Sequence, residues 1–327
     1  MISLPKNIKE ILVNQSIKNK LLFSYFMLIL LPLLSLTMVS YFKVSDFAED
    51  NMLNSAKKAL EQSNSYLEYK IGNIVQAMNV ITSDTNVHDI LYKNDPEYNN
   101  DVFAQIKSRN KLISFIDVQQ KSFEIFRIRL YVRDGLMFSD ENYNFFNLSK
   151  VHSLPWYNKL ISSKDLIMWF GPNYFLDNDN DYHTPIISAV RLIRSDNSFS
   201  TVISILRTDI PESVVKDIVS KSNLSNTGIS YIINNAGEII TFSGDKLLLN
   251  DSILRKTAED SSEPENTWIP CNSDGKKYLT IHVGVKNTNW QHITVIPYSE
   301  IRTPGTSIRN YMFVLMLITG VISYILA

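Results

Sequence analysis

The chain has 327 residues, of which 45% are hydrophobic and 20% charged, and 32 Lys and Arg against 33 Asp and Glu give a net charge of -1. The length suits about two domains of ordinary size, and the balanced charge disfavours nucleic-acid binding, which depends on a basic surface. Gly, Pro and Cys number only 10, 11 and 1, which excludes collagen, disordered and disulfide-scaffold proteins.

The first predicted element is an apolar run, residues 21–42, that contains no charged residue. As a helix it would extend about 33 Å, which matches a bilayer core of roughly 30 Å, so we predict a transmembrane helix. A secretory signal peptide is the alternative, but its apolar region is shorter and needs a small-residue cleavage site that residues 37–42 offer poorly. Lysines dominate the preceding tail, residues 1–20, and the positive-inside rule then predicts a cytoplasmic N-terminus.

Residues 43–83 follow with apolar or small side chains at steps of three or four, from Leu53 to Ile81. This spacing predicts one long amphipathic stalk helix of about 60 Å. Two interpretations of its apolar stripe stay open. The stripe packs against the chain's own domain, or it forms the seam of a coiled-coil homodimer.

The next segments predict a first sheet unit. Pro96–Lys121 has a helical pattern, and Ile125–Arg133 alternates, with apolar residues on one face and Arg129 and Tyr131 on the other. Such alternation predicts a half-buried strand. Residues 186–193 and 201–206 are joined by a turn-rich link, which predicts an antiparallel hairpin.

A second unit is predicted to begin at Asp209, as the cap of a short helix. Its strands are expected at residues 229–234, 238–242, 277–285 and 290–296. Helices followed by meandering strands predict an α+β fold, with the second unit as a smaller repeat of the first.

The final segment, residues 301–327, is predicted to be a linker and a truncated second transmembrane helix. Its uncharged run, Tyr311–Ala327, is slightly shorter than the ~20 residues of a full span. Residues 43–310 would then face the exterior of a bacterial cell membrane in a two-pass topology. The lone Cys271 allows no internal disulfide, which fits a bacterial exterior domain.

Short motifs along nearly the whole chain resemble the sensor half of bacterial receptors with a double Cache (dCache) domain, in particular YesM-like sensor histidine kinases. The motifs are Ser16–Leu22 (SIKNKLL), Leu154–Tyr157 (LPWY), Trp169–Pro172 (WFGP), Ser188–Arg191 (SAVR), Tyr231–Ile239 (YIINNAGEI) and Asn289–Trp290. The resemblance implies two PAS-like antiparallel sheet units on the stalk, a membrane-distal one at 84–208 and a membrane-proximal one at 209–300.

The resemblance also implies a function. We expect an extracytoplasmic ligand-sensing and transmembrane signalling module of a two-component sensor histidine kinase, with the kinase region absent from this chain. The partners would be membrane lipid, a second copy of the chain, and a small extracellular ligand or a solute-binding protein. The alternatives are a chemotaxis receptor, a cyclase, or a membrane-tethered scaffold that binds protein.

Catalytic and metal-binding patterns are not found. The five His residues are scattered, and the common hydrolase and nucleotide motifs are missing, so we expect no enzyme activity, no cofactor and no metal. Residues 177–181 (DNDND) begin like a calcium loop, but Tyr182 stands where Gly is needed, and a solvated loop is favoured.

Aromatic residues between the first strand and the hairpin occupy the segment that covers the pocket in PAS-like units. Aromatics with polar groups suit a small-ligand cleft, although they would equally cap the core of a sheet. Arg129 and Tyr131 could present donors to an anion, or simply be exposed. The candidate ligand-binding residues are therefore Trp156, Tyr157, Trp169, Tyr174, Arg129 and Tyr131.

The resemblance bears on the ligand as well. Amino-acid-binding dCache sensors place an Arg two residues before the Trp and an Asp near the end of the hairpin, whereas this chain has Leu154 and about Leu206 there, with Asp209 close by. Without such partners, the two opposite charges of a bound amino acid would be buried without compensating contacts. We therefore expect a sugar-like, peptide or carboxylate ligand and no tight binding of free amino acids.

Overall fold

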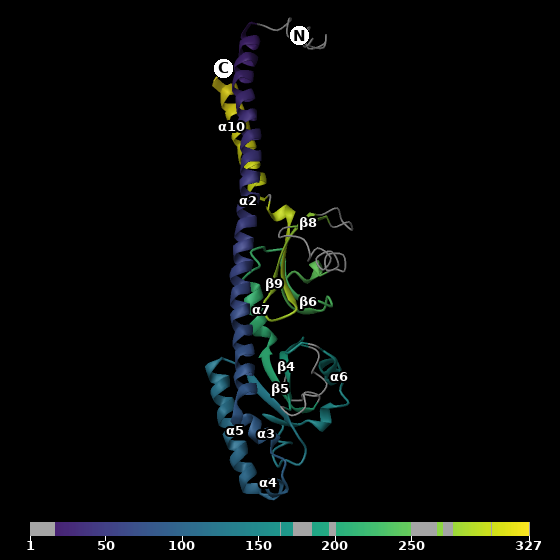
Figure 1. Ribbon diagram of the computed structural model, residues 1–327. Coiled ribbons are helices and arrows are strands. Elements are labelled where there is room, and N and C mark those ends of the chain that lie inside the picture. Colours follow the sequence, from purple (N-terminus) through teal and green to yellow (C-terminus); the bar gives the residue numbers. More distant parts are fainter. Residues whose placement is uncertain are drawn as a thin grey trace. The chain divides into compact units, whose positions relative to one another are not determined.

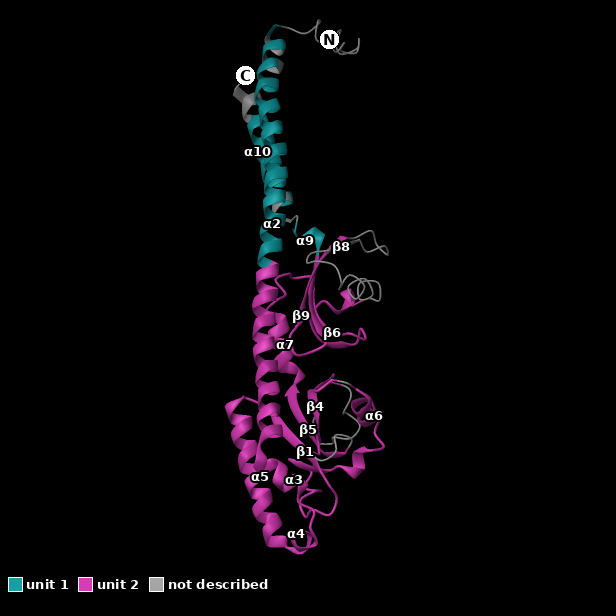
Figure 2. Ribbon diagram, viewed as in Figure 1, with its two compact units in different colours: residues 1–55, 297–327 teal, residues 56–296 magenta. Residues whose placement is uncertain are grey.

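The computed structural model describes residues 17–163, 165–172, 185–195, 201–249, 267–270, 277–301 and 303–326. The chain divides into two units, residues 1–55 with 297–327 and residues 56–296, coloured separately in Figure 2. The helix α2 (Ile17–Ser83) contributes residues to both units.

The smaller unit is helical. It contains the first part of α2 together with α9 (Tyr298–Ile301) and α10 (Thr303–Leu326). Large apolar side chains such as Leu28 and Leu317 are exposed. Among the described helices, one is long and apolar enough to cross a membrane, and α10 contains a shorter apolar stretch. A second span and the two-pass topology stay predictions.

The larger unit contains two five-stranded sheets (Figure 1). The first sheet has the order β2-β1-β5-β4-β3, and the second has the order β7-β6-β10-β9-β8. Numbered within its own sheet, each follows the order 2-1-5-4-3, in agreement with the predicted repeat of one design. The repeat differs in one pairing, because β1 and β2 are parallel, contrary to the predicted antiparallel sheet, whereas β6 and β7 are antiparallel. The strands of the first sheet are β1 (Arg127–Val132), β2 (Phe145–Asn147), β3 (Met168–Phe170), β4 (Ile186–Arg194) and β5 (Val202–Pro211). Those of the second are β6 (Ile229–Asn234), β7 (Ile239–Gly244), β8 (Thr267–Pro270), β9 (Lys277–Val285) and β10 (Trp290–Pro297).

One face of the first sheet packs against helices. Alternate β1 residues such as Ile128 and Leu130 join a buried apolar cluster with Ile74 of α2 and Leu112 of α5 (Val102–Ser122). The helix α3 (Thr85–Tyr92) adds further apolar side chains to the same cluster. The predicted strand and hairpin are confirmed, because β1 pairs with β5 and β5 with β4, all antiparallel.

The helix predicted over Pro96–Lys121 is divided in two. α4 (Pro96–Asn100) ends before Asp101, and α5 begins after it. The Asp101 backbone is extended, and its carboxylate accepts a hydrogen bond of 2.9 Å from the backbone N–H of Ala104. An aspartate that caps a new helix start satisfies a backbone donor that would otherwise lack a partner, and this favours the break.

The opposite face of the first sheet is covered as well. The 3-10 turn η1 (Ser149–Val151) and the helix α6 (Pro155–Ser162) belong to a second apolar cluster on this side, and Figure 1 shows α6 on the side of the sheet away from α2. Arg129 and Tyr131 are only 1% and 5% exposed. The expectation of a half-buried strand is therefore wrong, because both faces of β1 are buried.

The second sheet packs against α7 (Glu212–Ser220) and α2 through a face rich in small polar residues. Ser222 is hydrogen-bonded to the fully buried ring of His292 at 3.0 Å, and the hydroxyls of Ser230 and Thr294 lie 2.8 Å apart. The other face contains an apolar cluster with Tyr231 and the short turn η2 (Lys246–Leu248). Paired hydroxyls let these polar groups be buried at little cost.

The apolar stripe of α2 faces the chain's own domain within the larger unit. Leu60 is 1% exposed and Leu67 is not exposed at all, and between them Ser63 donates a hydrogen bond of 2.5 Å to the carbonyl of Ile218. The interpretation of this stripe as a dimer seam is therefore wrong for residues 56–81. A homodimer itself stays a prediction, and it would have to use another surface.

Cysteine cross-linking checks this packing. Cysteines placed at Leu60 and Leu67 should give little cross-linking between chains, because their side chains are covered by the domain's own sheets. Cysteines at the exposed neighbours Glu61 and Ser65 are the controls for accessibility. Efficient cross-links at Leu60 and Leu67, with none at the two controls, would restore the seam.

Candidate functional site

Two arginines and one aspartate form a buried charged group on the α6 side of the first sheet. Arg129 lies on β1, and Arg207 and Asp209 lie on β5, where residues two apart share a face. The strands pair Arg129 directly with Arg207. All three residues are at most 1% exposed. We call these three residues the charged group.

The carboxylate of Asp209 lies between the two guanidiniums. Its Oδ2 is 3.1 Å from Nε of Arg129, and its Oδ1 is 2.7 Å from Nε of Arg207. Ser188 on β4 donates a further hydrogen bond of 2.6 Å to Oδ1. A buried ion pair of this kind is tolerated only when additional hydrogen bonds satisfy it, and Ser188 contributes one of them.

Aromatic rings surround the charged group. Arg207 lies 3.4 Å from the hydroxyl of Tyr131, and the guanidinium carbon of Arg129 lies 5.1 Å from the ring centre of Phe146. The Trp156 ring contacts both Tyr131, at 5.6 Å between centres, and Phe170, at 6.4 Å. Trp156 follows Pro155, which starts α6 with a preset φ, so this helix fixes the indole against the sheet.

The structure brings together three of the six residues expected to bind a ligand, namely Arg129, Tyr131 and Trp156. Tyr157 is half-buried, and its ring lies 4.8 Å from His152. Trp169 lies on the other face of β3, where its ring packs against Trp290 of the second sheet at 5.2 Å. Tyr174 lies outside the described residues, as does the calcium-like segment 177–181.

Arg207 and Asp209 were not recognised from the sequence as site residues. The hairpin strand was expected to end at Leu206, but β5 continues to Pro211, so Asp209 is a strand residue and not a helix cap. The expected boundary between residues 208 and 209 thus falls within a strand. Leu206 belongs to the helix-side core, whereas Asp209 lies in the charged group on the other face of β5. The polar residues at positions 207 and 209 are two apart, and this spacing is the feature of the sequence that indicates a shared strand face.

In the part of the chain that the structure describes, no cluster of three or more His, Cys, Asp or Glu side chains could hold a metal ion.

Comparisons with solved structures show what this fold is similar to. The periplasmic sensory domain of the Campylobacter jejuni chemoreceptor Tlp1 matches with a TM-score of 0.58 and 10% identity, over 79% of this chain and 99% of that one. The sensory domain of the C. jejuni chemoreceptor Tlp3 (CcmL) with isoleucine bound matches with a TM-score of 0.53 and 14% identity, over 79% and 98%. The fold is that of a chemoreceptor sensory domain.

A third sensory-domain match is the ligand-binding domain of Mlp24 with asparagine, with a TM-score of 0.51, 15% identity and coverage of 79% and 99%. No family model and no curated protein matches the chain. At these identities, the likeness to chemoreceptor sensory domains establishes the fold alone, and the ligand has to be inferred from the side chains of this chain.

Proposed function

We propose that this chain is the ligand-sensing module of a transmembrane receptor and that its ligand binds beside the charged group on the first sheet. The supporting observation is the burial of Arg129, Arg207 and Asp209 next to Tyr131, whose ring contacts that of Trp156. Burying three ionisable side chains in a small sheet domain is costly, and a binding role explains why such a group would be kept. The aromatic wall beside it suits a small organic molecule.

The ligand we propose is a small carboxylate without an adjacent ammonium group. Guanidinium groups recognise carboxylates through paired hydrogen bonds, and two of them lie at this site. Asp209, which would be the natural partner of an ammonium group, is already bound to both arginines and to Ser188. A free amino acid would have to displace those contacts, so we expect it to bind weakly, although the Tlp3 and Mlp24 domains were solved with amino acids.

Calorimetry on the whole chain in lipid nanodiscs tests this proposal. We expect saturable binding of at least one of lactate, pyruvate, succinate and citrate. Trp156→Phe should weaken it at least about tenfold, because the indole contacts the site, whereas Trp169→Phe on the opposite face should leave it unchanged. Micromolar binding of a free amino acid that is lost in Trp156→Phe would contradict the proposed ligand class. Failure of all four carboxylates to bind would contradict the proposed site.

We further propose that residues 43–310 are extracytoplasmic and that the N-terminus is cytoplasmic. The support is the lysine-rich tail followed by a helix long and apolar enough to span a bilayer. The lone Cys271 makes a convenient probe. An impermeant thiol reagent should label it in intact cells, after mild denaturation if needed. Labelling that appears only after lysis would contradict the topology.

The receptor class is a finer part of the proposal. The motif resemblance supports a YesM-like sensor histidine kinase, and the similar solved structures come from chemoreceptors, whose fold this chain shares. Reading the coding sequence beyond Ala327 distinguishes the two. A kinase phosphoacceptor His region would support the first, and a long methylated coiled coil would support the second.

A further inference from the structure

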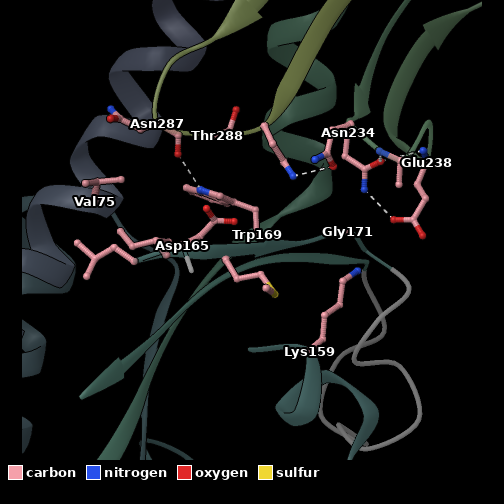
Figure 3. Close-up of a pocket in the computed structure, with 15 residues that line it drawn as sticks. Val75, Lys159, Asp165, Trp169, Gly171, Asn234, Glu238, Asn287 and Thr288 are labelled. Carbon is pink, nitrogen blue, oxygen red and sulfur yellow. Dashed lines mark hydrogen bonds between the residues drawn. The ribbon is translucent and has the colours of Figure 1, made fainter. Parts of the chain in front are cut away.

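A cavity lies between the two sheets of the larger unit, and none of Arg129, Arg207 and Asp209 lines it. It has a volume of about 510 Å³, which is within the range of small-ligand sites. One wall comes from β3 and the segment before it, and the other from the β6–β7 and β9–β10 turns, with Val75 of α2 and Lys159 of α6 at its edges (Figure 3). We call it the intersheet cleft.

The aromatic wall of the cleft is the ring of Trp169. Its indole N–H donates a hydrogen bond of 3.0 Å to the carbonyl of Asn287, and its ring packs edge-on against Trp290. Figure 3 shows Trp169 pointing from β3 toward Asn287 across the cleft. Trp290 is buried and Trp169 is half-buried, so the indole is held in place and still reaches the cavity.

The opposite wall consists of asparagine side chains held by the turns. The Oδ1 atom of Asn234 accepts hydrogen bonds from the backbone N–H groups of Ala236 and Glu238, and its Nδ2 donates to the Glu238 carboxylate at 2.7 Å. Asn289 donates a hydrogen bond of 2.9 Å to Oδ1 of Asn235. Asn235 and Asn289 are both exposed and line the cleft, and the hydrogen bond between them uses only one amide oxygen and one amide donor group.

The charge of the cleft differs from that of the first site. Its lining includes two carboxylates, Asp165 and Glu238, and one ammonium, that of Lys159. An anion gains little from such a lining. Amides, carboxylates and one fixed indole face instead match a molecule whose hydroxyl groups both donate and accept hydrogen bonds and whose C–H face is apolar.

We propose that the intersheet cleft binds a neutral saccharide. This goes beyond the carboxylate site, because none of Arg129, Arg207 and Asp209 lines the cleft. A sugar in the cleft would contact β3 of the first sheet and two turns of the second at the same time. Its binding therefore favours one arrangement of the two sheets, which gives the ligand a way to influence the signal.

Calorimetry on the whole chain in nanodiscs tests the proposal, with glucose, galactose, N-acetylglucosamine, maltose and sucrose as probes. We expect saturable binding of at least one probe with a Kd of about 1 mM or tighter. Asn235→Leu should weaken it at least about tenfold, because the leucine has a similar size but no amide. Asn110→Leu, an exposed asparagine on α5, is the matched control and should bind like the wild type.

Two further arms separate this proposal from the carboxylate site. Trp156→Phe should leave sugar binding unchanged, and Asn235→Leu should leave carboxylate binding unchanged. The saccharide proposal is overturned if no probe binds saturably or if the Asn235→Leu variant binds the sugar as tightly as the wild type. It is also overturned if Trp156→Phe weakens the binding of the sugar. None of these results affects the carboxylate proposal, which is judged by its own titration.

Discussion

Asp209→Asn should lower the unfolding midpoint of residues 56–296 by roughly 10 °C, one of the two largest effects expected here. The substitution keeps the shape of the side chain but removes the charge between the buried guanidiniums of Arg129 and Arg207. Breaking a buried ion pair from one side typically costs about 3–5 kcal/mol, because the remaining charge is left uncompensated. Here the loss of one carboxylate would leave two buried guanidinium groups without their negatively charged partner.

Thermal unfolding followed by tryptophan fluorescence measures this effect. All four tryptophans lie between residues 156 and 290, so the signal reports on the larger unit alone. Asp217→Asn, at an exposed position of α7, is the matched control and should change the midpoint by little. Arg207→Met should cost less than Asp209→Asn, since Asp209 then keeps Arg129. Equal midpoints for Asp209→Asn and Asp217→Asn would show that the charged group does not stabilise the fold.

Acidification is expected to have the other large effect, through His292. Complete burial of His292, a residue of β10 beside Ser222, lowers the pKa of this imidazole to about 3, because the charged form would lose its hydration. In the unfolded chain, a histidine has a pKa of about 6.5. The unfolded state therefore binds more protons, so the stabilisation is fully present above pH ~6.5 and is lost progressively as the pH falls toward 3.

The size of this loss follows from the linkage relation. Each pH unit within the window changes the unfolding free energy by about 1.4 kcal/mol, so roughly 2 kcal/mol should be lost between pH 7 and pH 5. Denaturant unfolding at several pH values should show a shallower slope for His292→Gln than for the wild type. His152→Gln, an exposed histidine, is the control and should keep the wild-type slope. Identical slopes for all three chains would contradict the assignment to His292.

Strand positions could be predicted from the sequence because they depend on local patterns. The strands at 229–234 and 277–285 were predicted with the observed bounds, since alternating apolar residues end at turn residues there. Errors occurred where a side chain competes with the pattern. Asp101 divides a predicted helix by capping a new one, and Asp209 resembled a cap but continues a strand.

Prediction of the candidate site required knowing which faces of the first sheet are buried, and the alternation of residues along a strand does not reveal this. The polar face of β1 reads as an open face, yet α6 and its neighbours cover it and bury Arg129 with Arg207 and Asp209. Arg207 and Asp209 are nearly eighty residues from Arg129 along the chain. Only the antiparallel register of β1 and β5 places them together.

The sequence by itself determined the α+β order of elements, the repeat of one sheet design and the apolar helix near the N-terminus. These features follow from hydrophobic periodicity and turn chemistry, which act between residues close along the chain. The tertiary structure alone decided that the α2 stripe is covered by the chain's own domain and that three charges are buried together. It also created the intersheet cleft from five separate segments of the chain. Burial and long-range strand pairing depend on segments that are distant along the chain, so no local sequence pattern encodes them.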